Sequence, residues 1–201
     1  MATRLLAAGL AASFLLVAAE MSAAITAWTQ VVARVYDTTG LSDSARRRAM
    51  TTAGAAMVTA SVEVAWVDCS EPSAPCQTGP APRDLVVRLV RGRSGADGQR
   101  VALGDALVDS GERTGLLATL YVDRVQRVAA TLGTDEDVLL GRAIAHELGH
   151  LLIGTSTHAR FGLMRGKWTN DELRRDRGAD WRFSARDAVL ISAKREVRRA
   201  K

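Results

Sequence analysis

Cysteine, proline, histidine and aromatic residues are all scarce in this chain of 201 residues. Two cysteines are too few for a disulfide-rich scaffold or for a zinc site built from several cysteines. Aromatic residues make up only 4% of the chain and no nucleic-acid-binding motif is present, which argues against a surface on which bases stack. The formal net charge is nevertheless +5, with a basic run at Arg46-Arg47-Arg48. We therefore expect a solvated basic surface and no nucleic-acid partner.

The N-terminal segment has an apolar run that is too short to cross a membrane. This run, from Leu5 to Ala19, has 15 residues, whereas a membrane-spanning helix needs about 20. One Arg precedes it, Glu20 ends it, and Ser22-Ala23-Ala24 offers a cleavage site of the A-x-A type. We therefore expect residues 1–24 to be a secretory signal peptide, with a retained anchor as the alternative. Residues 25–201 would then form one domain that is secreted or periplasmic, without a membrane partner.

Both cysteines and all four prolines fall in one short segment. Cys69 and Cys76 are separated by six residues there, two prolines lie between them, and the other two follow Cys76. In an exported protein, a close pair of cysteines in a proline-rich loop predicts a disulfide, with two free thiols as the alternative. Such a bond would close a surface loop and stabilise the fold by about 2–3 kcal/mol.

Hydrophobic periodicity and turn signals divide the rest of the chain into strands and helices. We predict strands near residues 31–36, 62–66, 85–90 and 101–109, and a segment 115–133 that begins as a strand and continues as a helix. We predict further helices over about 42–60, 134–154 and 183–200. This order favours an α+β fold in which one mixed, twisted sheet packs on helices.

The predicted helix 134–154 has clear signals at both ends. Thr134 or Asp135 can cap its first turn, and Gly154 lies where a glycine that ends a helix belongs. Its apolar positions recur at helical spacing, at Leu140, Ile144, Leu148 and Leu151. In the strand predicted over 101–109, Gly104 indicates a bulge or a place at the edge of the sheet.

The three histidines of the chain all lie in the stretch AHELGHLLIGTSTHARFGLM, which spans the end of this helix. His146 and His150 are four residues apart, so their rings project from one helix face and can bind one Zn²⁺. Glu147 between them suits a general base that accepts a proton from a zinc-activated water. Gly154 lets the chain turn back, so that His158 can reach the same metal. Three protein ligands would leave one position open for water and substrate.

This stretch resembles the active site of the metzincin clan of zinc metallopeptidases. The signature of that clan is H-E-x-x-H-x-x-G-x-x-H, followed by a methionine in a tight turn below the metal. His146, Glu147 and His150 match the signature position for position.

The remainder of the signature matches in residue type and differs in spacing. Gly154, His158 and Met164 correspond to the glycine, the third histidine and the methionine of the turn. Strict spacing would place the glycine and the third histidine at positions occupied here by Ile153 and Ser156. One residue is therefore added before the glycine and one after it.

The resemblance implies a zincin-like fold with an active-site helix and a C-terminal helix. It implies one catalytic Zn²⁺ held by His146, His150 and His158, with Glu147 as the general base. It also implies that an edge strand, for which 101–109 is our candidate, binds an extended peptide by strand addition. We therefore expect an exported zinc-dependent endopeptidase whose partner is a peptide or protein substrate.

Three alternatives remain open at this point. Glu172, in a charged segment further along the chain, could supply the third metal ligand in place of His158. The zinc could be structural, or it could belong to a pseudo-enzyme that binds peptide or protein without turnover. The site could also hydrolyse something other than a peptide bond.

Overall fold

The structure is a computed structural model that describes residues 28–72, 74–92, 102–109, 111 and 114–200. The predicted signal peptide, residues 1–24, lies outside these described residues. The strands are β1 (Thr29–Asp37), β2 (Val62–Asp68), β3 (Leu85–Val90), β4 (Gly104–Asp109) and β5 (Thr114–Tyr121). The helices are α2 (Asp43–Val58), α3 (Ala74–Gln77), α4 (Val122–Leu132), α5 (Glu136–Ile153), α6 (Asn170–Arg175) and α7 (Ala185–Ala200), with a 3-10 helix at Gly178–Trp181. No helix of this described part is both long and apolar enough to cross a membrane.

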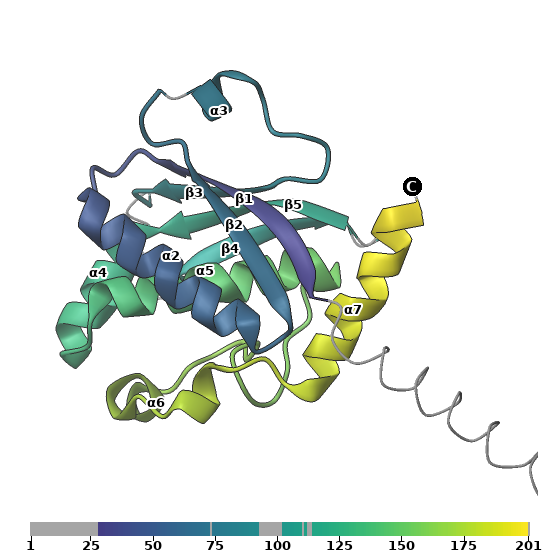
Figure 1. Ribbon diagram of the computed structural model, residues 1–201. Helices are drawn as coiled ribbons and strands as arrows, with labels where there is room; N and C mark the ends of the chain where they lie inside the picture. Colours follow the sequence, from purple (N-terminus) through teal and green to yellow (C-terminus); the bar gives the residue numbers. More distant parts are fainter. Residues whose placement is uncertain (1–27, 73, 93–101, 110, 112–113, 201) are drawn as a thin grey trace, which may run out of the picture.

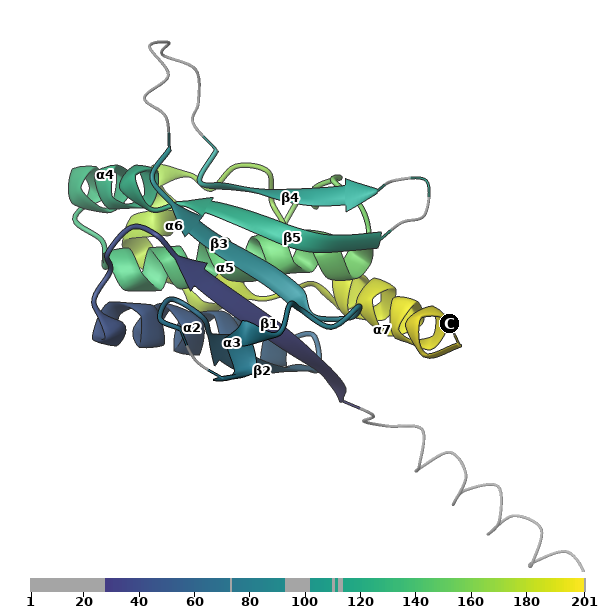
Figure 2. The ribbon, with the colours of Figure 1, turned by 90° about the horizontal axis from the view of Figure 1, so that it is seen from above.

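The five strands form one mixed sheet in the order β2-β1-β3-β5-β4 (Figure 2). Strands β2, β1, β3 and β5 run parallel to one another, and β4 runs antiparallel to β5 at one edge of the sheet. Adjacent parallel strands cannot be joined by a tight turn, which is why α2 crosses over between β1 and β2. The prediction of a mixed sheet packed on helices is thereby confirmed, as is the place of strand β4 at the edge.

Helices cover one face of this sheet (Figure 1). Helices α2 and α5 pack against each other and against the strands, and the core lies between them and the sheet. The fully buried strand residues alternate along the chain, as expected for one covered face: Ala33, Val35, Val62, Leu85, Val87, Leu89, Ala118 and Leu120. Helix α5 contributes four buried residues to the core, at the positions predicted from its periodicity: Leu140, Ile144, Leu148 and Leu151.

Both ends of α5 lie where the sequence predicts them. Asp135 is the N-terminal cap, and its carboxylate accepts hydrogen bonds from the N–H groups of Asp137 and Val138. Gly154 ends the helix with a φ of 71°, a left-handed conformation that glycine adopts without strain. These two signals set the length of α5. They therefore also set where the chain turns back toward His146 and His150 on that helix.

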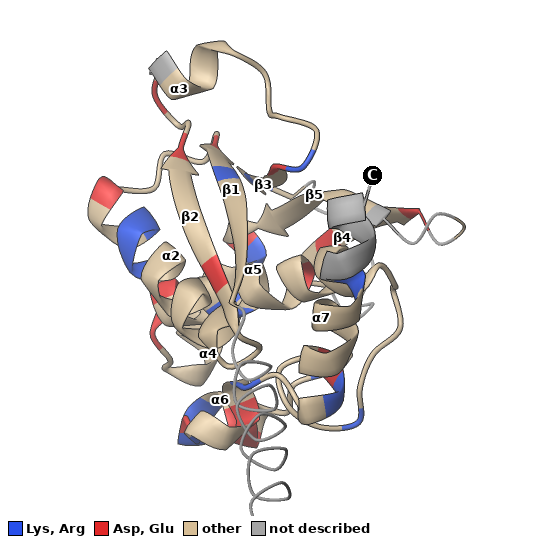
Figure 3. Ribbon diagram, turned by 45° about the vertical axis from the view of Figure 1, so that its right-hand side comes forward, with Lys and Arg blue, Asp and Glu red and all other residues tan. Residues whose placement is uncertain are grey.

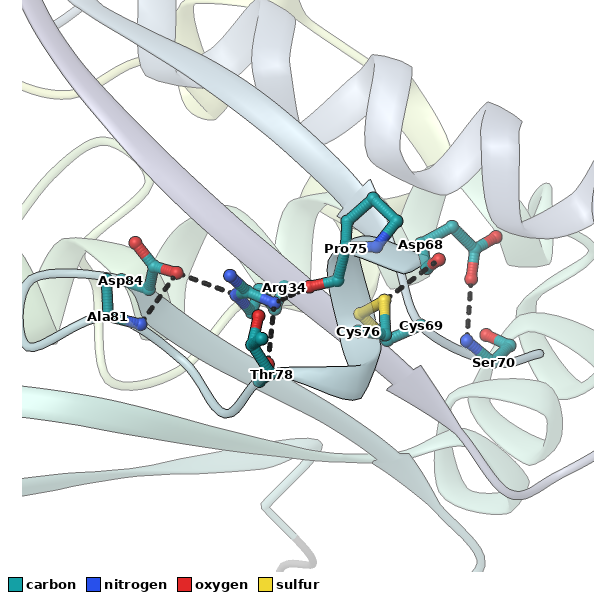
Figure 4. The surroundings of a disulfide bond; sticks show 9 residues. All are labelled: Arg34, Asp68, Cys69, Ser70, Pro75, Cys76, Thr78, Ala81 and Asp84. Carbon is teal, nitrogen blue, oxygen red and sulfur yellow. Dashed lines mark hydrogen bonds and ion pairs between the residues drawn. A yellow bond between two sulfur atoms is a disulfide. The ribbon is translucent and has the colours of Figure 1, made fainter. Parts of the chain in front are cut away.

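The predicted disulfide between Cys69 and Cys76 is present (Figure 4). The loop that contains it, with α3, lies on the face of the sheet opposite to α2 and α5 (Figure 1). Arg34 on β1 pairs with Asp84 at 2.6 Å and donates to the Pro75 carbonyl oxygen. The loop is therefore held to the sheet by an ion pair as well as closed by the disulfide.

The charged surface differs from the prediction at Arg46. Its guanidinium is buried, and it pairs with Asp37, Asp43 and Asp68 at the ends of three elements. The basic run that starts at this residue is therefore not wholly solvated, because its first member ties β1, α2 and β2 together. In the view of Figure 3, basic segments on α2, α6 and α7 lie beside acidic ones.

Candidate metal centre

The three histidines converge in the folded chain. The nitrogen atoms that His146, His150 and His158 can offer to a metal all lie within 4.8 Å of one another. The His158 ring centroid lies 5.3 Å from that of His146 and 4.8 Å from that of His150. Two of the rings come from one face of α5, and the third comes from the loop that follows it.

Each of the two helix histidines donates a ring N–H to a backbone carbonyl. His146 Nδ1 lies 2.8 Å from the Leu163 oxygen, and His150 Nδ1 lies 2.8 Å from the Thr155 oxygen. A carbonyl oxygen can only accept, so in the neutral rings both Nδ1 atoms carry the proton. Both Nε2 atoms then present lone pairs, although these two atoms lie only 3.1 Å apart. Facing lone pairs repel each other unless a proton or another cation lies between them.

Burial disfavours a proton in that place. It lowers the pKa of His146 to about 4, an effect opposed by the bond to Leu163 and reinforced by the other two histidines. Burial also lowers the pKa of His150. Both imidazoles are therefore neutral at pH 7, which is the form in which histidine binds a metal.

The spacing of the nitrogen atoms fits one metal ion. Ligand atoms at about 2.0–2.1 Å from a tetrahedral ion are about 3.3 Å apart. The 3.1 Å between the Nε2 atoms of His146 and His150 is close to that separation. In addition, the partners of both Nδ1 atoms fix the tautomer that a metal requires, as is usual for metal-binding histidines.

The loop after α5 brings the third histidine back to the helix. Gly154 reverses the chain, and the next carbonyl, that of Thr155, accepts the hydrogen bond from His150. Ser156, where strict metzincin spacing would place the third histidine, is exposed. His158 lies two residues further on and joins the cluster, so the added residues are accommodated within the loop.

Met164 is buried in the core against helix α5. It is 2% exposed, and its Sδ would lie 2.5 Å from a Cβ placed on Gly149. Glycine at position 149 therefore leaves the space that the methionine occupies beneath α5. Gly162 starts the same turn with a φ of 75°, and a Cβ there would lie 2.6 Å from the Arg182 carbonyl oxygen. The turn therefore requires a glycine at position 162 for its own conformation and a glycine at position 149 of α5 for the space that Met164 fills.

Glu172 does not belong to the cluster. It caps α6 by accepting a hydrogen bond from the Thr169 N–H at 2.7 Å, and it pairs with Arg165. These bonds lower the pKa of Glu172, the hydrogen bond from Thr169 having the largest effect. Among the described residues, the three histidines are the group that could hold a metal ion.

Glu147 is buried beside the histidines at the wall of a cavity. Its side chain is 7% exposed, and together with His146 it lines a cavity of about 570 Å³. Burial raises the pKa of Glu147 to about 8, and the charge of Asp105 adds to that effect. No hydrogen bond to its carboxylate is found among the described residues, so its oxygens are free to interact with a bound molecule.

The edge strand β4 passes close to this glutamate. A Cβ placed on Gly104 would lie 2.9 Å from Glu147 Cγ, so the first residue of β4 is in contact with the site. The predicted edge position of Gly104 is confirmed, whereas the bulge lies further along, between Leu107 and Val108.

Part of the site could not be recognised from sequence patterns. The indole of Trp168, a residue type that a sequence pattern assigns to packing, lines the cavity and contacts His146 with ring centroids 5.6 Å apart. The Leu163 carbonyl orients His146, but a backbone group has no signature in a sequence. The rest of the cavity wall combines apolar and polar residues: Ala102, Leu103, Val128, Ala143, Arg165, Gly166, Lys167, Asn170 and Leu173.

No protein-family model matches this chain, and no curated protein matches it either.

Proposed function

We propose that this protein is a zinc-dependent endopeptidase with a metzincin-like core. The observation that carries the proposal is the pair of unprotonated Nε2 atoms of His146 and His150, which face each other at 3.1 Å beside a buried carboxyl group. A metal-binding pair with a base at its side, on the wall of a cavity, is an arrangement suited to metal-assisted hydrolysis.

Zinc is the metal that the three ligands favour. Neutral imidazole is a common zinc ligand, and three protein ligands are typical of catalytic rather than structural zinc sites. A zinc ion bound there would act as a Lewis acid that makes water a better nucleophile at neutral pH and polarises a substrate carbonyl. The exposed side of His158 leaves this site open to solvent.

Glu147 is the residue that we propose as the general base. Its carboxylate would accept the proton of the attacking water and then pass a proton to the leaving amine. A base works best when its pKa lies near the working pH, and the raised pKa of this buried group is consistent with that role. No hydrogen bond to this carboxylate is found among the described residues, which leaves its oxygens available for both transfers.

Strand β4 and the cavity would bind the substrate. An extended peptide can add to the exposed edge of β4 through backbone hydrogen bonds, and Gly104 places that edge beside Glu147. One substrate side chain would then enter the cavity, where Leu103 and Leu173 offer apolar contacts. Export of the protein, which we infer from residues 1–24 and from the disulfide, would put this activity outside the cytoplasm.

The test is cleavage of a diverse peptide library by the zinc-loaded domain with and without Glu147→Gln. The variant keeps the shape of the side chain but cannot accept a proton, so we expect turnover to fall at least about 1,000-fold. Zinc content, measured by atomic absorption, should be unchanged because the three histidines remain. Glu136→Gln, in the first turn of the same helix, is the matched control and should cleave at the wild-type rate.

Each outcome of this test has a definite meaning. Cleavage by Glu147→Gln at the wild-type rate would exclude the proposed base. A wild-type protein that binds zinc but cuts no peptide in the library would favour the alternative of a zinc-dependent binding protein. A wild-type protein that does not bind zinc would overturn the proposal at its first step.

A further inference from the structure

One backbone oxygen beside the metal centre accepts two side-chain hydrogen bonds. The Leu163 carbonyl lies 2.8 Å from His146 Nδ1 and 3.2 Å from the indole Nε1 of Trp168. A carbonyl oxygen has two lone pairs, so the indole N–H occupies one and leaves the other directed at the histidine. The orientation of His146 thus depends on an oxygen that Trp168 also holds.

The peptide that carries this oxygen is held on both sides by the chain itself. The Leu163 N–H donates to the Arg182 carbonyl at 2.8 Å, and the Met164 carbonyl accepts from the Ala159 N–H at 2.8 Å. These bonds anchor the neighbouring groups of the turn. They do not involve the Leu163 oxygen, whose two side-chain donors are His146 and Trp168.

The ring of Trp168 is itself fixed by aromatic contacts. It meets the His146 ring edge to face at 5.6 Å and the Trp181 ring edge to face at 5.2 Å. The Arg142 guanidinium lies 3.9 Å from the Trp181 ring centroid, and Arg142 is on α5 one turn before His146. The indole is therefore braced against the same helix whose histidine it helps to orient.

We propose that Trp168 is a positioning residue for the metal centre. Its N–H holds the Leu163 carbonyl in the direction that fixes the tautomer and the ring plane of His146. Partners of metal-binding histidines of this kind contribute about 10–100-fold to metal affinity. Because Trp168 acts through one intervening carbonyl, we expect an effect near the lower end of that range. This inference rests on the proposed metal site.

Two tryptophans in contact provide a matched pair of variants. Trp168→Phe keeps an aromatic ring in place and removes the N–H that holds the Leu163 oxygen. Trp181→Phe makes the same chemical change at a more deeply buried ring, and no acceptor for its N–H is found among the described residues. If loss of packing alone mattered, the change at Trp181 would be at least as harmful.

The experiment measures zinc affinity by competition with a chromogenic chelator, and the visible spectrum of the cobalt-loaded protein. We expect Trp168→Phe to weaken zinc binding about tenfold and to shift the cobalt absorption bands. Trp181→Phe keeps an aromatic ring against Trp168 and loses an N–H that has no acceptor among the described residues, so it should leave both unchanged. Thermal unfolding of the metal-free variants shows whether each is folded, and Trp168→Leu, which also lacks the N–H and cannot bind a metal, is a second, smaller replacement if the phenylalanine variant is not.

The outcomes separate this inference from the proposed function. Equal zinc affinity and equal cobalt spectra in the wild type and the folded Trp168 variant would overturn the positioning role. So would equal losses in the two phenylalanine variants, because packing would then explain both. A wild type that binds no zinc would instead overturn the metal site itself, whatever the tryptophan variants do.

Discussion

At the scale of single residues, the three histidines differ in how firmly they are held. His146 and His150 are buried, and each is fixed by a hydrogen bond from Nδ1 to a carbonyl oxygen. His158 is exposed on a loop, where its ring is backed by Gly166, whose Cβ would lie 3.0 Å away. The helix pair is thus preorganised, and His158, the proposed third ligand, approaches it from the loop outside the helix.

Replacing the third ligand tests which residue completes the coordination. We expect His158→Ala to weaken zinc binding about 100-fold or more, because one of three protein ligands is lost. Glu172→Ala should leave zinc affinity within about threefold and destabilise the fold by about 1 kcal/mol, because it removes the capping-box hydrogen bond from the Thr169 N–H at the start of α6. Chelator competition and thermal unfolding of both variants give these quantities. Strong loss of zinc in Glu172→Ala, with little loss in His158→Ala, would reverse the assignment.

At the scale of elements, the site depends on how closely α5 packs on the turn that contains Met164. Gly149 lies between the two helix histidines, and its missing side chain leaves room for the methionine sulfur and the Phe183 ring. The spacing within α5 therefore supplies two candidate ligands, His146 and His150, and also the glycine that leaves space for the methionine.

Filling this gap should disturb both the packing and the metal centre. In Gly149→Ala, overpacking costs about 1–3 kcal/mol, which outweighs the gain of about 1 kcal/mol in helix propensity. We expect a lower unfolding free energy in urea and weaker zinc binding, since Met164 must move. The matched control is Gly54→Ala in α2, where a Cβ would meet Trp66 Nε1 at 3.4 Å, so the propensity gain should prevail there. A stabilised Gly149→Ala with normal zinc affinity would contradict the proposed packing.

At the scale of the whole molecule, a buried arginine joins elements that are far apart in the sequence. Arg46 links the ends of β1 and β2 to the start of α2 through Asp37, Asp68 and Asp43. Burial by itself would raise the pKa of Asp68, but hydrogen bonds from Ser70 and Arg46 and the positive charge of Arg46 lower it below its usual 3.8. The ionised carboxylate is therefore favoured by the folded state.

This shift predicts how stability depends on pH. A carboxylate whose pKa is lower in the folded state stabilises the fold above its unfolded pKa, and this stability is lost as the pH falls. The difference in unfolding free energy between wild type and Asp68→Asn should therefore be largest near pH 6 and shrink toward pH 3. Urea unfolding of the metal-free proteins across this range measures it, with the exposed Glu71→Gln as control. Parallel curves for wild type and Asp68→Asn would argue against the linkage.

Local interactions explain what the sequence by itself determined. The ends of α5, its buried face and the spacing of His146 and His150 follow from capping groups and helical periodicity, which act over a few residues. The disulfide was predictable for the same reason, because its cysteines lie close together in one loop. Short helices such as α6 were not predicted, since a few capping bonds outweigh the weak periodicity of so short a segment.

Only the tertiary structure decided the features that join distant residues. It brings His158 rather than Glu172 to the helix histidines, places Gly104 beside Glu147, and buries Arg46, which a charged run would leave in solvent. It also supplies the Leu163 carbonyl and the Trp168 indole to His146. These contacts depend on how the chain returns over itself, and neither composition nor periodicity carries information about which backbone groups will meet a given side chain.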